Sequence, residues 1–280
     1  MIYGIKVIVK YLLGTDEADR DLAVYPDDTF IVSYPRSGNT WTRFLIANLA
    51  FPSETVSFTN IERLIPDTSS QSNRALKRTP RPRIIKSHQY FDPRYRKVLY
   101  IVRDPRDLVL SYYNFQRRSR QIADAYPLAN YVDDFVNARL ISADWGSWGE
   151  NVASWLYTRQ NHNGFLLMRY EDMKANTTQE LQRIASFLRL QPTPERIQQA
   201  IDASSSDRMR ELERHQANQW VATKKHRKDI PFVGPATSGR WHEHLPVPLA
   251  AKIESKWGEL MSRLGYPLIA SDPQLAHSIR

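Results

Sequence analysis

The chain has 280 residues, enough for one large α/β domain with a full core, and 41% of them are hydrophobic, which excludes a disordered chain. Its 39 lysines and arginines against 30 aspartates and glutamates give a formal net charge of +9. That surplus suits an anionic partner without choosing between nucleic acid, anionic lipid and a small polyanion. The absence of cysteine excludes disulfides and thiolate metal sites, and we expect a cytoplasmic protein.

The first 28 residues are expected to form an N-terminal extension. Apolar residues of 1–14 recur at helical spacing, and Lys6 and Lys10 interrupt them. The stretch therefore predicts a helix packed on the domain, with a membrane-surface anchor as the alternative. No transmembrane segment is expected, and the missing small-residue cleavage site argues against a signal peptide.

The segment 30–41, FIVSYPRSGNTW, predicts a buried strand, a tight loop and a helix that starts near Trp41. The start of a helix offers free N–H groups and the positive end of its dipole. Gly38 would allow close approach of a ligand to the backbone, and Arg36 would add a fixed positive charge. The segment is thus typical of a cradle for phosphate or sulfate.

Two other interpretations of this loop are weaker. A nucleotide-hydrolase P-loop needs a Gly-Lys-Ser/Thr ending, and no lysine precedes Thr40, so an ATPase or a kinase is disfavoured. An ordinary strand-to-helix turn, capped by Ser37 or Asn39, would carry no ligand. The neighbouring motifs decide between these alternatives.

Further short apolar runs predict three more strands, at 84–85, 98–102 and 165–168. Helical patterns follow at 108–115, 131–140, 148–159, 178–188, 194–203 and 249–264. This alternation predicts a central parallel sheet flanked by helices, in which ligands bind at the carboxyl ends of the strands. Polar residues do follow each strand, at 34–40, 86–88, 103–106 and 170–172.

Two long polar segments, 67–83 and 221–240, are expected to be mobile loops, because long loops in a compact domain are often lids or substrate loops. The second holds the basic run Lys-Lys-His-Arg-Lys at 224–228. Solvated connections remain the alternative for both.

Candidate reacting residues follow the predicted strands. Lys86 and His88 supply a cation and an imidazole, which titrates near neutrality and can accept a proton. Arg103 ends another strand, and Ser111 lies two turns into the next helix, where both could meet a second anion. His242 and His244 have neither the helical spacing nor the third ligand of a metal site, so no metal is expected.

Taken together, these motifs resemble those of the cytosolic-type sulfotransferases, and the chain resembles a bacterial-like member of that family. SYPRSGNTW is similar to the family's 5′-phosphosulfate loop, KSH to its catalytic Lys-x-His, and VLYIVRDPRDLVLSYYNF to its 3′-phosphate motif. GSWGENVASW and RYEDMKANTTQELQRIASFL resemble later segments of the family. The resemblance runs in order from about residue 29 to 190, which makes an accidental match improbable.

The resemblance implies a P-loop-like three-layer sandwich and a single sulfotransferase domain over residues 1–280. It further implies transfer of a sulfuryl group from 3′-phosphoadenosine 5′-phosphosulfate (PAPS) to a hydroxyl or amine of a small-molecule acceptor, leaving 3′,5′-adenosine bisphosphate (PAP). Neither a metal nor a nucleic-acid partner is implied, and the oligomeric state stays open. A nucleotide-binding relative without turnover and a P-loop kinase are the rival interpretations.

The resemblance also implies site residues. Arg36, in place of the family's usual lysine, would hold the 5′-phosphosulfate, Lys86 would neutralise the sulfuryl group, and His88 would be the general base. Trp41 would stack on the adenine. The other residues implied to bind the donor are Ser37, Gly38, Asn39, Thr40, Arg103, Ser111, Tyr170 and Ser204.

The sequence departs from the family in its late segments. The family's Arg-Lys-Gly clamp on the 3′-phosphate aligns with Gly-Pro-Ala at 234–236, and Ser206 stands where a second aromatic would cover the adenine. Arg227 or Lys228 is our candidate for the missing clamp, and a solvated charge run is the alternative. Aromatic residues near the predicted centre tilt the acceptor toward a small hydrophobic or aromatic alcohol, although the basic surplus points the other way.

Overall fold

The structure, a computed structural model, describes residues 17–140 and 144–269. The helix predicted at 1–14 lies outside these residues. A parallel sheet forms the centre, with strands β1 (Thr29–Ser33), β2 (Ile84–Ser87), β3 (Lys97–Val102) and β4 (Phe165–Arg169). The strand order is β2-β1-β3-β4. The predicted parallel sheet is confirmed, and each predicted strand lies within an observed one.

These segments become strands because they are apolar on both faces, which a parallel sheet covered by helices requires. Phe30 and Val32 point to one face and Ile31 to the other, and none of the three is exposed to solvent. In the register, Ile31 of β1 lies opposite Lys86 of β2 and Leu99 of β3. The strands therefore end at one edge, and their following loops meet there.

Helices cover both faces of the sheet, which confirms the predicted layers. The described helices longer than four residues are α2 (Asn39–Ala50), α4 (Asn73–Lys77), α5 (Pro105–Arg118), α6 (Leu128–Val136), α7 (Trp148–Arg159), α8 (Tyr170–Ala175), α9 (Thr177–Leu188), α10 (Pro194–Ala203), α11 (Ser206–Gln216) and α13 (Val247–Arg263). Shorter ones are η1 (Asp19–Asp21), α3 (Ile61–Leu64) and α12 (Trp241–His244). No helix in the described ranges has the length and apolar character to cross a bilayer.

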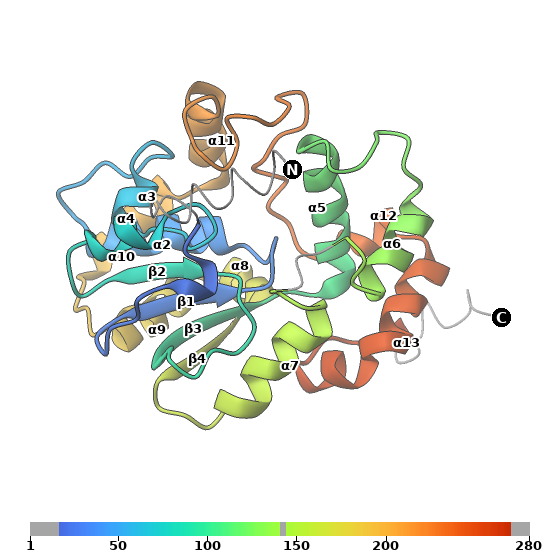
Figure 1. The fold of residues 1–280 in the computed structure, drawn as a ribbon, viewed down its shortest axis with the longest axis horizontal. Coiled ribbons are helices and arrows are strands. Elements are labelled where there is room, and N and C mark those ends of the chain that lie inside the picture. Colours follow the sequence, from blue (N-terminus) through green and yellow to red (C-terminus); the bar gives the residue numbers. More distant parts are fainter. Residues whose placement is uncertain (1–16, 141–143, 270–280) are drawn as a thin grey trace, which may run out of the picture.

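The two faces have separate cores. Phe30 and Val32 pack with residues of α5, α6, α7 and α13, whereas Ile31 packs with residues of α2, α9, α10 and α11. Figure 1 shows α5, α6, α12 and α13 grouped on one side of the sheet, and α2, α9 and α10 on the other. The carboxyl edge of the strands lies between these groups, and this is where the pocket opens.

Three segments differ from the sequence-based expectation. α6 ends at Val136 instead of continuing to residue 140, because Ala138 takes a left-handed conformation with φ of 56°. The segment 67–83 contains α4, whose start is capped by the Ser72 hydroxyl, so it is not a loop throughout. α11 was not predicted, since few of its residues are apolar and only Met209, Leu212 and Glu213 are buried.

Candidate active site

A pocket of about 1210 Å³ opens at the carboxyl edge of the sheet. The carboxyl end of each strand, with the residues that follow it, contributes to the wall: Gly38 and Trp41 follow β1, Lys86 and His88 lie at the end of β2 and just after it, Arg103 follows β3 and Tyr170 follows β4. The geometry of a parallel sheet thus brings together residues as far apart in the chain as Gly38 and Tyr170.

The loop between β1 and α2 has the shape of an anion cradle. Gly38 is the N-cap of α2 with φ of 91°, and no side chain of the described residues caps the helix start. The first N–H groups of α2 are therefore free of side-chain partners at a point where the helix dipole is positive. Arg36 also has a positive φ, of 69°, so the loop turns twice within three residues.

Gly38 also allows Tyr170 to close over the loop. A Cβ atom built on Gly38 would lie 2.5 Å from the Tyr170 ring, which is itself buried. We expect Gly38→Ala to lower the free energy of unfolding by about 1–3 kcal/mol, because it adds backbone strain to this clash. Urea unfolding measures the effect, and Gly234→Ala is the matched control, since no atom in the described part of the chain lies within 4 Å of a Cβ atom at Gly234. Equal stability of the two variants would contradict the argument.

The Arg36 guanidinium points toward α5. Its Nε donates to the Ser111 hydroxyl at 3.2 Å, and its Nη2 donates to the Phe232 carbonyl at 3.2 Å. The rings of Phe115 and Phe232 lie 5.0 and 4.8 Å from its central carbon. Burial, with the nearby charges of Arg103 and Arg118, lowers the pKa of Arg36 to about 10, so it remains charged at neutral pH.

Arg103 lies against the same loop. Its Nη1 donates to the Arg36 carbonyl at 3.1 Å, and its guanidinium stacks on the Tyr170 ring at 4.5 Å. Arg36, Arg103 and Ser111 are therefore gathered in one part of the pocket, which is rich in positive charge. The assignment of Arg36 to one anion and Arg103 to another stays a prediction, and the structure places the two arginines side by side.

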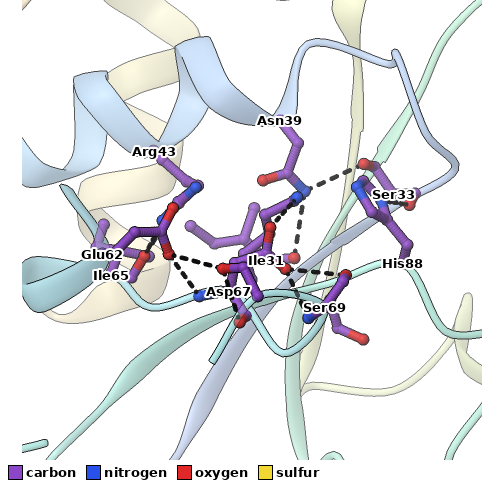
Figure 2. A network of polar contacts seen from close by, with 12 residues as sticks. Ile31, Ser33, Asn39, Arg43, Glu62, Ile65, Asp67, Ser69 and His88 are labelled. Carbon is purple, nitrogen blue, oxygen red and sulfur yellow. Dashed lines mark hydrogen bonds and ion pairs between the residues drawn. The ribbon is translucent and has the colours of Figure 1, made fainter. Parts of the chain in front are cut away.

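His88 is held in a defined tautomer. Its Nδ1 lies 2.7 Å from the Ser33 carbonyl oxygen, which can only accept, so Nδ1 carries the hydrogen and Nε2 keeps its lone pair. Figure 2 shows the imidazole beside Ser33 at the end of β1. Burial and the neighbouring Lys86 ammonium lower the pKa of His88 to about 3. The imidazole is consequently neutral at pH 7, with the lone pair of Nε2 unprotonated.

Lys86 forms a buried ion pair with Asp67, and both residues line the pocket. Asp67 Oδ1 also accepts from the backbone N–H and hydroxyl of Ser69, at 2.9 and 3.0 Å, and Figure 2 places Asp67 beside Ser69 and Glu62. Burial by itself raises the pKa of Asp67, but the charge of Lys86, with that of Arg43, more than offsets this and holds the pKa below its usual range. The ammonium is thus positioned and partly neutralised.

Five other residues predicted for the site have their side-chain polar groups inside the protein or outside the pocket wall. The Asn39 amide donates to the Ile31 carbonyl and the Ser33 hydroxyl, inside the protein, although Asn39 lies in the pocket wall. The hydroxyl of Ser37 is buried without a hydrogen-bond partner among the described residues. Ser204 is fully buried: its carbonyl accepts from Trp41 Nε1 and its hydroxyl from Asn48.

Arg227 and Lys228 also lie away from the pocket wall. Arg227 forms ion pairs with Asp124 and Asp229, and Lys228 donates to the carbonyls of Ala217 and Thr223. Neither lines the pocket. Thr40 and Ser206 do line it, as do Trp41 and Ser111.

Sequence reasoning missed several charged residues of the pocket wall, among them Asp67 and Arg118. Asp67 falls in a segment predicted as a mobile loop, and Arg118 lies three residues beyond the end of the motif that resembles the 3′-phosphate segment. The helix predicted at 108–115 continues to Arg118 in the structure, and the spacing of seven residues places Arg118 on the same face as Ser111. Nothing in the sequence marked Asp67. In the described ranges, no group of three His, Cys, Asp or Glu side chains is arranged to hold a metal ion.

Comparison with known proteins agrees with this arrangement. The family described as "Sulfotransferase domain" matches residues 26–265. Sulfotransferase 1A1 of Mus musculus is 26% identical over 270 residues, which cover 91% of each chain. The amine sulfotransferase of Oryctolagus cuniculus is 22% identical and covers 86% of this chain and 83% of its own.

Solved structures show the same fold. A mouse sulfotransferase complexed with PAP superposes with a TM-score of 0.71 and 22% identity, over 87% of each chain. Retinol dehydratase in a complex with retinol and PAP gives a TM-score of 0.74 and 16% identity, over 87% of this chain and 84% of its own.

Proposed function

The chain belongs to the sulfotransferase domain family, and from this premise we propose that it transfers a sulfuryl group from PAPS to a hydroxyl, or an amine, of a small-molecule acceptor in the cytoplasm. One observation carries the proposal. A neutral imidazole, His88, and an ammonium, Lys86, face the same pocket as the helix-start cradle at Gly38. Those are the groups needed for in-line transfer of an anionic group to a hydroxyl.

In this proposal, His88 is the general base. Its Nε2 accepts the proton of the acceptor hydroxyl while the hydroxyl oxygen forms a bond to sulfur. The bond between sulfur and the bridging oxygen breaks, and PAP leaves with the electron pair. Lys86 offsets negative charge at the sulfuryl oxygens, and the free N–H groups at the start of α2 bind the 5′-phosphate. The bond from Nδ1 to the Ser33 carbonyl keeps the imidazole in the required tautomer.

The residues of the pocket wall suit the rest of the donor. Trp41 and Tyr170 lie edge to face at 6.0 Å and form an aromatic wall for an adenine. The indole is held in place by its bond to the Ser204 carbonyl, so Ser204 supports the nucleotide site without touching the pocket. Arg36, Arg103 and Ser111 form the positive region for a phosphate.

The part of the pocket beside His88, where the acceptor would bind, combines the imidazole with apolar surface. Trp145 stacks edge to face on His88 at 5.5 Å, and Leu110, Phe115 and Leu140 add apolar surface. We propose a small acceptor with an apolar or aromatic body that rests on this surface and presents its hydroxyl to His88 Nε2.

The proposal is tested by incubating the protein with sulfate-labelled PAPS and a panel of phenols, aliphatic alcohols, sugars and amines. We expect labelled product with at least one class and no effect of a chelator on the rate, because sulfuryl transfer is served here by fixed positive side chains. Loss of activity with chelator would favour a nucleotide kinase. Tight PAP binding without transfer to any class would favour a relative without turnover.

A further inference from the structure

The positive region of the pocket includes an arginine that no motif identified. Arg118 ends α5, lines the pocket and is 1% exposed. We propose that Arg118 binds the 3′-phosphate of the donor, in place of the clamp that the Gly-Pro-Ala sequence at 234–236 cannot provide. The inference rests on the proposed donor, PAPS.

The geometry of α5 directs Arg118 toward this phosphate. Ser111 and Arg118 are seven residues apart, which places them on the same helix face and about 10.5 Å apart along the axis. Long side chains on a helix point back toward its N-terminus. The Arg118 side chain therefore extends toward Ser111, where the Arg36 guanidinium also lies.

The hydrogen bonds of Arg118 leave part of its guanidinium available. Nη1 donates to Glu213 Oε1 at 2.7 Å and to the Ile230 carbonyl at 2.8 Å. Nε and Nη2 are buried and have no hydrogen-bond partner among the described residues. An unpaired donor in a buried site is costly, and a buried charged group even more so. Two such donors on one planar group match the spacing of two phosphate oxygens.

The positive charge around Arg118 also favours the binding of an anion. Arg36 is close enough to Arg118 and Arg103 for both charges to lower its pKa. In the described ranges, Arg118 pairs with Glu213, whereas neither Arg36 nor Arg103 has a carboxylate within ion-pair distance. A phosphate carrying about two negative charges would offset this repulsion.

The contacts of Glu213 show which part of the Arg118 guanidinium has a structural role. Its carboxylate accepts from the backbone N–H groups of Phe232 and Val233, at 2.6 and 2.9 Å, and so fixes the segment that covers Arg36. Arg118 contributes to this support through Nη1 alone. The nitrogens proposed for phosphate binding are different atoms, so a ligand-specific experiment can distinguish the two.

The experiment measures the affinities of PAP and adenosine 5′-monophosphate (AMP), which lacks the 3′-phosphate, by calorimetry. We expect Arg118→Met to weaken PAP binding about 10- to 100-fold, the loss of a charge-assisted pair, and to leave AMP binding within about threefold. Arg117→Met is the matched control: Arg117 is the adjacent arginine on α5, and it does not line the pocket. It should leave both affinities unchanged.

The outcomes separate this inference from the proposed function. Equal losses for PAP and AMP in Arg118→Met would mean that the residue only supports the fold, and no loss of PAP affinity would mean that it does not bind the phosphate; either result overturns the inference. If the methionine variant does not fold, Arg118→Lys replaces it, with an expected partial loss confined to PAP. A wild-type protein that does not prefer PAP to AMP would instead contradict the proposed donor.

Discussion

Replacing His88 with asparagine is expected to lower kcat about 10²- to 10⁴-fold, the usual contribution of a general base. The asparagine amide can still donate to the Ser33 carbonyl that now binds Nδ1, so the local structure keeps this contact. What the variant lacks is the lone pair of Nε2, and no other atom of asparagine reaches its place. The affinity for PAP should stay within about threefold, because His88 does not belong to the positive region around Arg36.

Sulfuryl transfer from labelled PAPS, measured at saturating acceptor, gives the rate, and calorimetry gives the PAP affinity. His242→Asn is the control, since His242 is exposed and lies outside the pocket wall. If His88→Asn kept more than about a tenth of the wild-type kcat, proton acceptance by His88 would not limit the reaction. A parallel loss of PAP affinity would show instead that the loop after β1 had been disturbed.

The second large effect is expected at the ion pair between Lys86 and Asp67. Lys86→Met should lower the free energy of unfolding by about 3–5 kcal/mol, because it leaves the Asp67 carboxylate buried without its partner. It should also lower kcat about 10²- to 10³-fold, since the proposed charge at the sulfuryl group is lost. Urea unfolding and labelled transfer measure the two effects separately.

The double variant Lys86→Met, Asp67→Asn distinguishes structure from catalysis. It removes the unpaired charge, so most of the lost stability should return, while kcat should stay low. Recovery of the rate together with stability would mean that Lys86 serves the fold alone. Failure to recover stability would mean that contacts other than the ion pair hold this part of the pocket, such as the bonds from Ser69 to Asp67.

The same pair makes stability depend on pH. Because the pKa of Asp67 is lower in the folded protein than its ordinary value of 3.8, the unfolded chain binds a proton first as the pH falls. The stabilisation is therefore complete well above pH 3.8 and is lost progressively below it. In Asp67→Asn this part of the acid-induced loss of stability should disappear.

The sheet and the anion loop could be predicted from the sequence because they depend on short-range signals. Apolar runs marked the strands, and the apolar-periodic segment from Trp41 marked the helix, which begins two residues earlier, at Asn39. α11 gave no such signal, since its helix is stabilised by the Ser205 cap and a few buried residues on an otherwise polar surface. Propensity and pattern carry little information for an element of this kind.

Side-chain directions were less predictable than backbone positions. Arg36 was expected at the sulfuryl end, yet its guanidinium turns toward Ser111 because Phe115, Phe232 and the Phe232 carbonyl receive it there. Those partners come from segments 79 and 196 residues further along the chain (115 − 36 = 79; 232 − 36 = 196). The pairing of Asp67 with Lys86 is likewise tertiary, and no local pattern predicts it.

The contact between Gly38 and Tyr170 has a consequence for folding on the ribosome. β1 pairs with β2 and β3, which follow it in the chain, but the ring that closes the loop after β1 is part of the element after β4. Parallel pairing is non-local and slow, and the N-terminal part of a domain emerges first. If the elements form in chain order, the anion loop stays open until residue 170 has left the exit tunnel, and segment 230–233, which contacts Arg36, covers it later. Nucleotide binding would then require that the final third of the chain has been synthesised. A ligand-binding assay on stalled chains of increasing length would distinguish the emergence of residue 170 from that of segment 230–233.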